Sequence, residues 1–474
     1  MFSKATYISR RKSLKSKIQT GLLLFLGNDE SSINFKDNWY PFRQDSTFLY
    51  FFGIDIPGLA AIIDIDEDKE IIFGDDRSVE DSVWIGSTPG IHELAAAVGV
   101  TLTLPKSEVS TILLKSSKRG VHYLPPFRPE NKQKISEWLK IDQTETSVGA
   151  SVDFIKAVVS LRSFKSSDEI IEINKAIDIT VDMHLAVMKM ARAGLKEYEL
   201  AGVVHRKAIE SGGQLAYPLI LTINGQILHN HFQGNTLKDG NMVLCDAGAE
   251  TDLHYAGDLT RTFPVGANFS NQQKEIYQIV LDAHLSAIAA LKPGVRFIDV
   301  HLVACRKLAE GLKSIGLMKG NVEDAVDHGA HALFFQCGLG HMMGLDVHDM
   351  EDLGEQYVGY TEELRKSTQF GIKSLRLGKT LEKDFVLTVE PGIYFIPELI
   401  DLWHGENRHS DYINYENLMK YRAFGGIRVE DNFVITKDNA QMLGKPLPRT
   451  IDDIQDVRNE SLNDKLFGVF RLPR

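Results

Sequence analysis

Cysteine is scarce in this sequence, and long apolar runs are absent. The 474 residues include 3 cysteines, Cys245, Cys305 and Cys337, which lie far apart along the chain. These thiols are too few and too scattered for a disulfide framework or a cysteine-based zinc site, so we expect a reducing compartment. No apolar run reaches the ~18 residues that a membrane-spanning helix requires. We therefore expect a cytoplasmic protein with no membrane partner.

Positive charge is in the minority. The chain has 53 Lys and Arg residues against 64 Asp and Glu residues, which gives a net charge of −11. This balance argues against nucleic acid as a partner and leaves carboxylates available for cations. The N-terminus is the exception, because it is basic and has no acidic residue before Asp29. A targeting peptide would be basic too, but no small-residue cleavage site follows, so we expect a basic helix that leads into a first strand.

Apolar patterning divides the chain into two domains, residues 1–158 and residues 159–474. In the first domain, short apolar runs between turn residues predict strands, and longer periodic segments at 91–98 and 130–140 predict helices. The apolar runs are residues 21–27 (GLLLFLG), 47–53 (TFLYFFG), 59–65 (LAAIIDI) and 70–74 (EIIFG). Alternating strands and helices are typical of an α/β domain.

The second domain has a different pattern. Ser166 and Glu169 form a capping box before a long helical segment at 168–192, and a second helix is expected at 197–211. Strands at 242–250 and 254–265 flank a short polar turn, which predicts a hairpin. Helices at 271–291 and 297–315 and strands at 384–395 and 426–436 complete the pattern. We expect an α+β domain with a central, largely antiparallel sheet.

Five short strings in the second domain carry acids or histidine inside apolar segments. They are CDAG at 245–248, YAGD at 255–258, GLGH at 338–341 with GLDVH at 344–348, TVEPG at 388–392, and IRVED at 427–431. Burying an unpaired carboxylate costs several kcal/mol or raises its pKa until it is neutral. These acids are therefore paired with cations, unless the strand assignments are wrong.

Metal ions are the cations that fit best. Four carboxylates and one imidazole nitrogen are available, on Asp246, Asp258, Glu390, Glu430 and His341. Two divalent ions would balance the four charges and acidify a bridging water as nucleophile. Oxygen-rich ligation with one imidazole favours Mn²⁺, with Zn²⁺, Co²⁺ or Fe²⁺ as alternatives. The competing interpretation is that the acids form separate salt bridges and turns.

A second possible chelating pair is His301 and Cys305, which lie four residues apart on an expected helix. A pair without further ligands is more often incidental, so no site is predicted there.

The five strings resemble the metallopeptidases of the pita-bread fold, which include methionine aminopeptidase, aminopeptidase P and prolidase. The resemblance extends to the flanking strings DLTRTFP at 258–264 and LTVEPGIY at 387–394. It implies a pita-bread catalytic domain with a dinuclear centre. Asp246 would bind one metal, His341 and Glu390 the other, and Asp258 and Glu430 would bridge both.

The first domain is similar to the N-terminal domain of aminopeptidase P, through residues 40–53 and VWIG at 83–86. In that branch a Trp at this place helps to close the proline pocket, sometimes from a neighbouring subunit. The resemblance thus implies a substrate contact for Trp84 and a homo-oligomer, either a dimer or a tetramer. A packed core aromatic is the other interpretation of Trp84.

The expected activity is metal-dependent hydrolysis of the bond between an N-terminal residue and a following proline, with such peptides as partners. Prolidase activity, restricted to Xaa-Pro dipeptides, is the alternative, and a non-catalytic interaction protein is a remote one. By resemblance, His229 and His348 would stabilise the carbonyl oxygen or the leaving nitrogen, and Glu390 would act as general base. Arg428 would bind substrate or hold the metal carboxylates in place.

The sequence departs from the family pattern at two places. Asp246 and Asp258 are one residue further apart than is usual, and we expect the turn at 251–254 to absorb the insertion. Cys337 stands where relatives commonly carry a histidine, four residues before His341. This change removes no expected ligand, but we expect it to alter substrate contacts or the handling of the leaving group.

Overall fold

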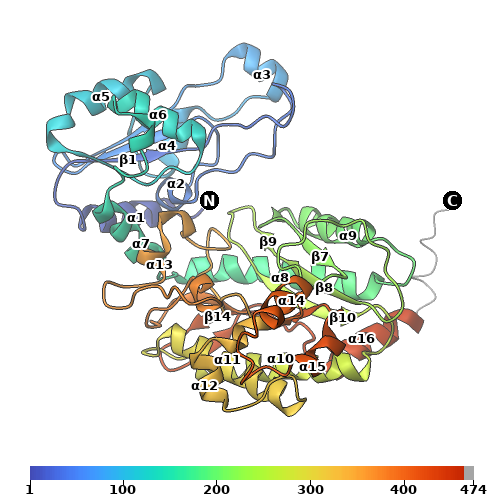
Figure 1. Cartoon of the computed structure of the whole chain (residues 1–474). Helices are drawn as coiled ribbons and strands as arrows, with labels where there is room; N and C mark the ends of the chain where they lie inside the picture. Colours follow the sequence, from blue (N-terminus) through green and yellow to red (C-terminus); the bar gives the residue numbers. More distant parts are fainter. Residues whose placement is uncertain (464–474) are drawn as a thin grey trace. The chain divides into compact units, whose positions relative to one another are not determined.

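The computed structural model describes residues 1–463 and consists of two compact units (Figure 1). The N-terminal unit comprises Met1–Ser163 together with Met350–Val358, and the C-terminal unit comprises Phe164–Asp349 and the described residues from Gly359 onward. The expected boundary after residue 158 falls inside helix α7 (Val152–Arg162). Residues 464–474 of the expected second domain lie outside the described part of the chain.

The N-terminal unit is built on a mixed five-stranded sheet with the strand order β4-β3-β2-β1-β5. One face of this sheet packs against α5 and α6 through apolar residues such as Leu24, Ile62 and Leu113. The strands are β1 (Leu22–Leu26), β2 (Ala60–Asp64), β3 (Lys69–Phe73), β4 (Leu102–Leu104) and β5 (Val121–Tyr123). The helices are α1 (Lys4–Lys15), α2 (Ser46–Phe52), α3 (Val79–Ile85), α4 (Ile91–Ala97), α5 (Val109–Lys115), α6 (Pro129–Leu139), α7 and α13 (Glu355–Val358).

The expected strand at 47–53 is wrong, because this run forms helix α2. Asp45 caps its N-terminus by accepting a hydrogen bond from the Phe48 backbone, and Gly53 ends it in the left-handed conformation at φ 63°. All residues of α2 are buried, and a helix that is buried all round has no polar face. A short apolar run of this kind cannot be distinguished from a buried strand by its periodicity.

The basic N-terminal segment forms helix α1, as expected. Its Arg11 is buried and donates hydrogen bonds to Glu70 at 2.7 Å and to the carbonyls of Phe51 and Val98 at 2.9 Å. Arg10 lies over the ring of Tyr50, with its guanidinium carbon 4.0 Å from the ring centroid. These two arginines therefore hold the N-terminal unit together.

The C-terminal unit places short antiparallel sheets between two pairs of helices (Figure 1). Helices α8 and α9 pack together, with α8 against β8, β9 and β10, and helices α10 and α11 form the second pair, with α10 against β11, β12 and β13. The helices are α8 (Ser167–Met190), α9 (Glu197–Glu210), α10 (Asn271–Ala290), α11 (Phe297–Ser314), α12 (Val322–Asp327), α14 (Pro397–Gly405), α15 (Tyr415–Leu418) and α16 (Ile451–Asn463). The strands are β6 (Gln214–Leu215), β7 (Ile220–Thr222), β8 (Met242–Ala247), β9 (Ala249–Glu250), β10 (Leu259–Pro264), β11 (Val386–Val389), β12 (Gly392–Tyr394), β13 (Gly426–Arg428), β14 (Asp431–Ile435) and β15 (Ala440–Met442).

Most of the expected elements of this unit are present. The capping box of Ser166 and Glu169 begins α8, and β8 pairs antiparallel with β10 in the expected hairpin. A turn at 251–254 separates the two arms, with His254 at φ 64°. Within residues 1–463, no helix combines the length and the apolarity needed to cross a membrane.

The two late strands differ from expectation in one respect. The strand expected at 384–395 is divided into β11 and β12, with Glu390 between them, and the strand expected at 426–436 is divided into β13 and β14, with Glu430 between them. An isolated bridge pairs Glu430 with Thr260 of β10. Both glutamates therefore lie outside the regular strand pairing of the sheet. The bridge to Thr260 brings Glu430 beside β10.

Candidate metal centre

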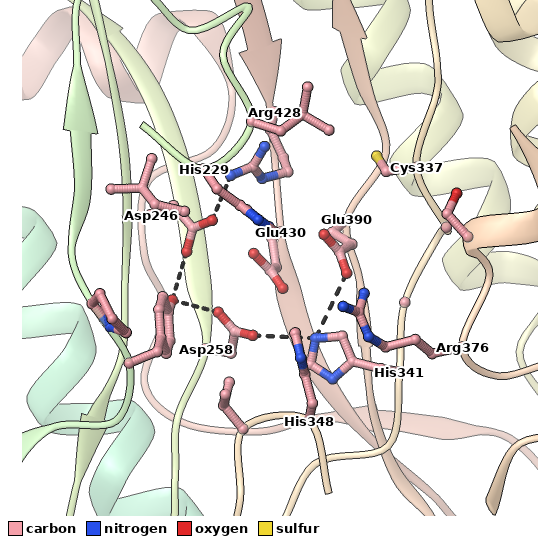
Figure 2. A pocket seen from close by; sticks show the side chains of 18 of the residues that line it. His229, Asp246, Asp258, Cys337, His341, His348, Arg376, Glu390, Arg428 and Glu430 are labelled. Carbon is pink, nitrogen blue, oxygen red and sulfur yellow. Dashed lines mark hydrogen bonds and ion pairs between the residues drawn. The ribbon is translucent and has the colours of Figure 1, made fainter. Parts of the chain in front are cut away.

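Five segments of the C-terminal unit converge on one cavity of about 330 Å³. Asp246 lies near the end of β8, Asp258 directly before β10, Glu390 and Glu430 at the strand interruptions, and His341 in the loop that pairs with β11 through Met342. All five side chains line this cavity, and Figure 2 shows them pointing toward its centre. The structure therefore brings together every metal ligand that the sequence predicts.

The histidine links two of the carboxylates. His341 Nε2 lies 3.3 Å from Asp258 Oδ2 and 3.6 Å from Glu390 Oε1. Its other ring nitrogen, Nδ1, lies 3.0 Å from the carbonyl oxygen of Met342. A backbone acceptor at Nδ1 favours the tautomer in which Nε2 carries the free lone pair that a metal needs. Donor atoms of Asp258, His341 and Glu430 all lie within 4.8 Å of one another.

Three of the four carboxylates, those of Asp246, Asp258 and Glu430, are buried, whereas Glu390 is partly exposed. Glu430 Oε2 accepts a hydrogen bond from Thr260 at 2.7 Å, but its Oε1 is buried without a hydrogen-bond partner among the described residues. An unpartnered carboxylate oxygen is costly in a buried position, and a cation would satisfy it. The donor set, four carboxylates and one imidazole, therefore fits divalent metal ions.

The electrostatics of the cluster support the same interpretation. Burial and the neighbouring Asp246 raise the pKa of Asp258 to about 7. Burial also raises the pKa of Glu390 to about 7, although His341 and Arg428 act in the opposite direction. The pKa of Glu430 lies well above its usual value because of burial and the charges of Asp258 and Glu390. Without metal, the cluster therefore holds protons that divalent cations would displace.

The guanidinium group of Arg428 contacts other side chains of the protein. Its guanidinium donates to Asp246 Oδ2, to Tyr394 Oη at 2.8 Å and, through Nε, to Thr260 Oγ1 at 3.1 Å. Burial alone would lower the pKa of Arg428, but Tyr394, Asp246 and the two glutamates raise it well above its usual value. These contacts favour the second expected role, in which Arg428 holds the ligand carboxylates in place.

Sequence reasoning missed Tyr217 and Arg376. The Tyr217 hydroxyl lies 2.6 Å from Asp246 Oδ1 and 2.5 Å from Asp258 Oδ1, and burial beside these charges raises its pKa well above the usual value. Arg376 lines the cavity on the side of Glu390 (Figure 2). Neither residue lies in one of the five strings, so the sequence pattern carried no signal for either.

The two expected non-ligand histidines and Cys337 also line the cavity. The rings of His341 and His348 are 4.4 Å apart between centroids, at an interplanar angle of 72°. Partial desolvation, with Arg428 and Arg376 nearby, lowers the pKa of His229, so this ring is neutral at neutral pH. Burial and Glu390 raise the pKa of the Cys337 thiol to about 12, which keeps it protonated.

Trp84 is not among the residues that line this cavity in the described part of the chain. It lies on α3 in the N-terminal unit, where its side chain is 80% exposed. The alternative interpretation, in which Trp84 is a packed core aromatic, is therefore wrong.

Comparison with known proteins gives two family matches. Residues 172–437 match metallopeptidase family M24, and residues 7–122 match the aminopeptidase P N-terminal domain. The first match contains all five ligand positions.

Individual relatives cover nearly the whole chain. Human Xaa-Pro dipeptidase is 30% identical over 96% of this chain and 92% of its own length. A probable Xaa-Pro aminopeptidase of Phaeosphaeria nodorum is 32% identical over 89% of this chain and 88% of its own length. Among solved structures, a variant of Escherichia coli aminopeptidase P in complex with substrate superposes with a TM-score of 0.81 at 28% identity, covering 98% of this chain and 100% of that one.

Proposed function

The chain belongs to metallopeptidase family M24, and on this premise we propose that its cavity hydrolyses the peptide bond between an N-terminal residue and a following proline. The observation that carries the proposal is the cluster of four carboxylates and one histidine around the cavity, with one glutamate oxygen left unpartnered among the described residues. Relatives and structural neighbours that are named Xaa-Pro aminopeptidases supply the substrate class.

We propose Mn²⁺ as the native metal of the dinuclear centre. Oxygen-rich ligation with a single imidazole and no thiolate ligand suits Mn²⁺ better than softer ions. Zn²⁺, Co²⁺ and Fe²⁺ remain the alternatives, and a zinc-substituted form of Escherichia coli aminopeptidase P has been solved. Metal analysis of the protein purified without added metal would identify the ion, and a zinc or iron content equal to two ions per chain would refute manganese.

Residues around the cluster account for the remaining catalytic needs. When bound, two divalent cations acidify a water molecule and polarise the scissile carbonyl. Glu390 accepts the proton of the attacking water and returns it to the leaving nitrogen, since its carboxylate lines the cavity in which the bond is cleaved. His229 and His348 donate hydrogen bonds to the developing oxyanion and the leaving nitrogen. Arg428 and Tyr217 keep Asp246 in position through hydrogen bonds.

Proline specificity follows from the chemistry of the bond. Proline has no amide N–H and a fixed φ, so a general peptidase that binds an extended backbone through that N–H handles it poorly. Apolar cavity residues, such as Pro218, Leu228 and Val347, offer a surface for the proline ring. The free N-terminal amine of the substrate would lie near the metal centre, beside the carboxylates that line the cavity.

Xaa-Pro dipeptidase activity is the second candidate, favoured by the 30% identity to human Xaa-Pro dipeptidase. After chelation and reloading with Mn²⁺, kcat/KM should be compared for an Xaa-Pro-Yaa tripeptide and the matching Xaa-Pro dipeptide. The aminopeptidase proposal expects preference for the tripeptide and release of its N-terminal residue. Preference for the dipeptide would transfer the assignment, and inactivity on both substrates in every metal would refute a peptidase.

We also propose a homo-oligomer in which α3 contacts a second copy of the chain. Helix α3 buries none of its own residues and exposes apolar side chains, with Val79 at 85% and Val83 at 75% exposure. Covering such a face would explain why apolar side chains lie there. Trp84 would then take its expected part in closing a proline pocket.

Light scattering coupled to gel filtration tests the oligomer directly. We expect a dimer or a tetramer for the natural chain and a smaller species for a Val83→Asp variant. In the intact oligomer, Trp84→Ala should raise KM more than it lowers kcat. A monomeric natural chain with full activity would refute both the interface and the role of Trp84.

We place the protein in the cytoplasm. All three cysteines are unpaired, and Cys245 and Cys305 are buried. Unpaired thiols are usual in a reducing compartment. Fractionation of the source cells would test this, and recovery outside the cytoplasm would refute it.

A further inference from the structure

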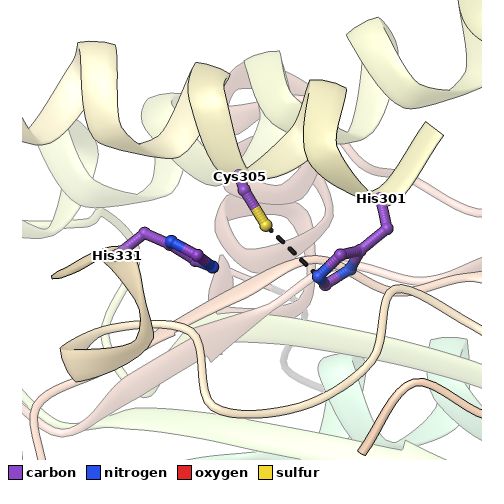
Figure 3. A group of neighbouring side chains, drawn as sticks. All are labelled: His301, Cys305 and His331. Carbon is purple, nitrogen blue, oxygen red and sulfur yellow. Dashed lines mark hydrogen bonds between the residues drawn. The ribbon is translucent and has the colours of Figure 1, made fainter. Parts of the chain in front are cut away.

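A second group of possible metal ligands lies outside the lining of the cavity. His301 and Cys305 are four residues apart on α11, so both side chains project from the same face of the helix. His331 comes from the short 3-10 helix Ala330–Leu333, and Figure 3 shows its ring directed toward Cys305. The sequence spacing indicated only an incidental pair, and the tertiary fold adds the third donor.

The distances suit one shared ion. Cys305 Sγ and His301 Nε2 are 3.4 Å apart, and one donor atom from each of the three residues lies within 4.8 Å of the others. With bonds of ~2.0 Å to nitrogen and ~2.3 Å to sulfur, two ligands of one ion stand roughly 3.5–3.8 Å apart. Small side-chain rotations are therefore enough to complete coordination.

Burial leaves these side chains without other polar partners. His301 and His331 are each 1% exposed and Cys305 is 0% exposed. Among the described residues, Nδ1 of His301 and both ring nitrogens of His331 have no hydrogen-bond partner. The Val326 carbonyl raises the pKa of His331 slightly without meeting hydrogen-bond geometry. Buried polar atoms of a native protein normally have partners, so three unpartnered nitrogens in one place call for a ligand.

Both imidazoles are available as neutral donors. Burial lowers the pKa of His301 to about 3 and that of His331 to about 4. Both rings are therefore neutral at neutral pH, and a neutral imidazole has one nitrogen lone pair to offer a metal. The thiol of Cys305 can release its proton on binding, so that the S–H bond is replaced by a metal–sulfur bond and the proton passes to solvent.

We propose that His301, Cys305 and His331 form a buried binding site for one thiophilic metal ion, with Cu⁺ as the preferred ion. One thiolate and two neutral imidazoles leave Cu⁺ with no net charge, whereas Zn²⁺ would leave one uncompensated positive charge in the interior. Thiolate and imidazole are also donors that suit copper. The oxygen-rich centre of the cavity, in contrast, suits harder ions.

A bound ion would connect two parts of the C-terminal unit. The ion would join α11 to the segment at 330–333, which leads directly into the loop that carries Cys337 and His341. Binding to the folded protein alone raises its apparent stability. We therefore expect bound Cu⁺ to increase Tm. This inference does not depend on the proposed peptidase activity, because the site has its own ligands.

Anaerobic titration of the metal-free full chain with Cu⁺ against a chromophoric Cu⁺ chelator tests the site. We expect one ion per chain, with X-ray absorption showing one sulfur and two nitrogen ligands. Cys305→Ser should abolish the sulfur signal. His331→Gln should weaken binding by more than the roughly 10–100-fold that loss of an outer-shell partner costs.

Cys337→Ser is the matched control, because Cys337 is a thiol that lines the main cavity and could capture a thiophilic ion there. It should keep the bound ion, and Cys245→Ser should do so too. Thermal unfolding of each metal-free variant establishes that it is folded, and if Cys305→Ser is unfolded, His331→Gln decides. No binding by the natural chain, or a sulfur signal lost with Cys337 rather than Cys305, would overturn the site. A parallel Zn²⁺ titration that binds more tightly than Cu⁺ and depends on Cys305 would support the site but overturn the preference for Cu⁺.

Discussion

Thr260 supports the metal centre through its hydroxyl group, and replacing it by valine should weaken metal binding. Thr260 is fully buried, and its Oγ1 donates to Glu430 Oε2 at 2.7 Å while accepting from Arg428 Nε at 3.1 Å. Valine keeps the shape of the side chain but removes both hydrogen bonds. Glu430 would then lose its one protein hydrogen-bond donor to Oε2 among the described residues.

The magnitude follows from the charge of the acceptor. A hydrogen bond to an ionised group contributes about 1.5–3 kcal/mol, and each 1.4 kcal/mol is about tenfold in an equilibrium constant. We therefore expect roughly 10–100-fold weaker metal binding, the range also typical of outer-shell substitutions. The loss falls on metal affinity, because Glu430 holds a proton in the metal-free cluster and is charged when it ligates a cation. Without the Thr260 hydroxyl, the carboxyl group of Glu430 holds its proton more tightly, and the metal ion has to displace that proton in order to bind.

Two variants serve as controls for this prediction. Thr260→Ser retains the hydroxyl group and should bind metal nearly as well as the natural chain. Thr262→Val alters a threonine that is equally buried but exchanges hydrogen bonds, at 3.2 Å, with the backbone of Arg428 alone. Mn²⁺ affinity is measured by competition with a fluorescent chelator. Unchanged binding by Thr260→Val, or an equal loss in Thr262→Val, would refute the reasoning.

Four further predictions follow from the site and the core. Because burial raises the pKa values of Asp258 and Glu390 to about 7 without metal, Mn²⁺ binding should release protons, and its affinity should increase as pH rises from 6 to 8. Calorimetry in buffers of different ionisation enthalpy measures the released protons, and finding none would contradict the prediction. Glu390→Gln should lower kcat by at least ~10²-fold with saturating metal, and a loss confined to KM would argue against proton transfer. Cys337→Ser should change kcat/KM only a few-fold, since a thiol with a pKa of about 12 carries no charge; a large loss would assign the thiol a direct role. Burial lowers the pKa of His184 to about 4 in the folded protein, whereas in the unfolded chain this histidine takes up a proton near pH ~6.5. The contribution of His184 to the free energy of unfolding is therefore complete above pH ~6.5 and should fall by up to about 3 kcal/mol as the pH drops toward 4. Denaturant unfolding of His184→Gln should show a flatter acid dependence than that of the natural chain.

The ligands of the centre could be found from the sequence because each occurs in an unusual local context. A carboxylate flanked by apolar strand residues is costly unless a cation pairs with it. Any one of these acids alone could form a salt bridge, so it was the five strings together that indicated a metal centre. Their common cavity depends on segments from Asp246 to Glu430, which only the fold brings together. The supporting residues were less visible, because Tyr217 and Arg376 lie outside the strings and their role depends on contacts across the cavity.

The prediction of the fold was wrong where an element is buried on all sides and therefore has no polar face. Helix α2 has no exposed residue, so its seven apolar and small side chains had the pattern of a buried strand. The late strands were correctly located but were expected to be continuous. Glu390 and Glu430 interrupt them, because each carboxylate has to leave the ladder to reach the cavity.

The sequence by itself determined the two-part organisation, most helices and strands, and the residue types of the metal centre. Local capping, periodicity and misplaced charge are all properties of neighbouring residues, so a linear pattern records them. The tertiary structure alone decided that Arg428 turns toward Asp246, that Thr260 supports Glu430, and that His331 joins the pair on α11. These contacts join residues far apart in the chain, and their geometry depends on how whole elements pack rather than on any local spacing.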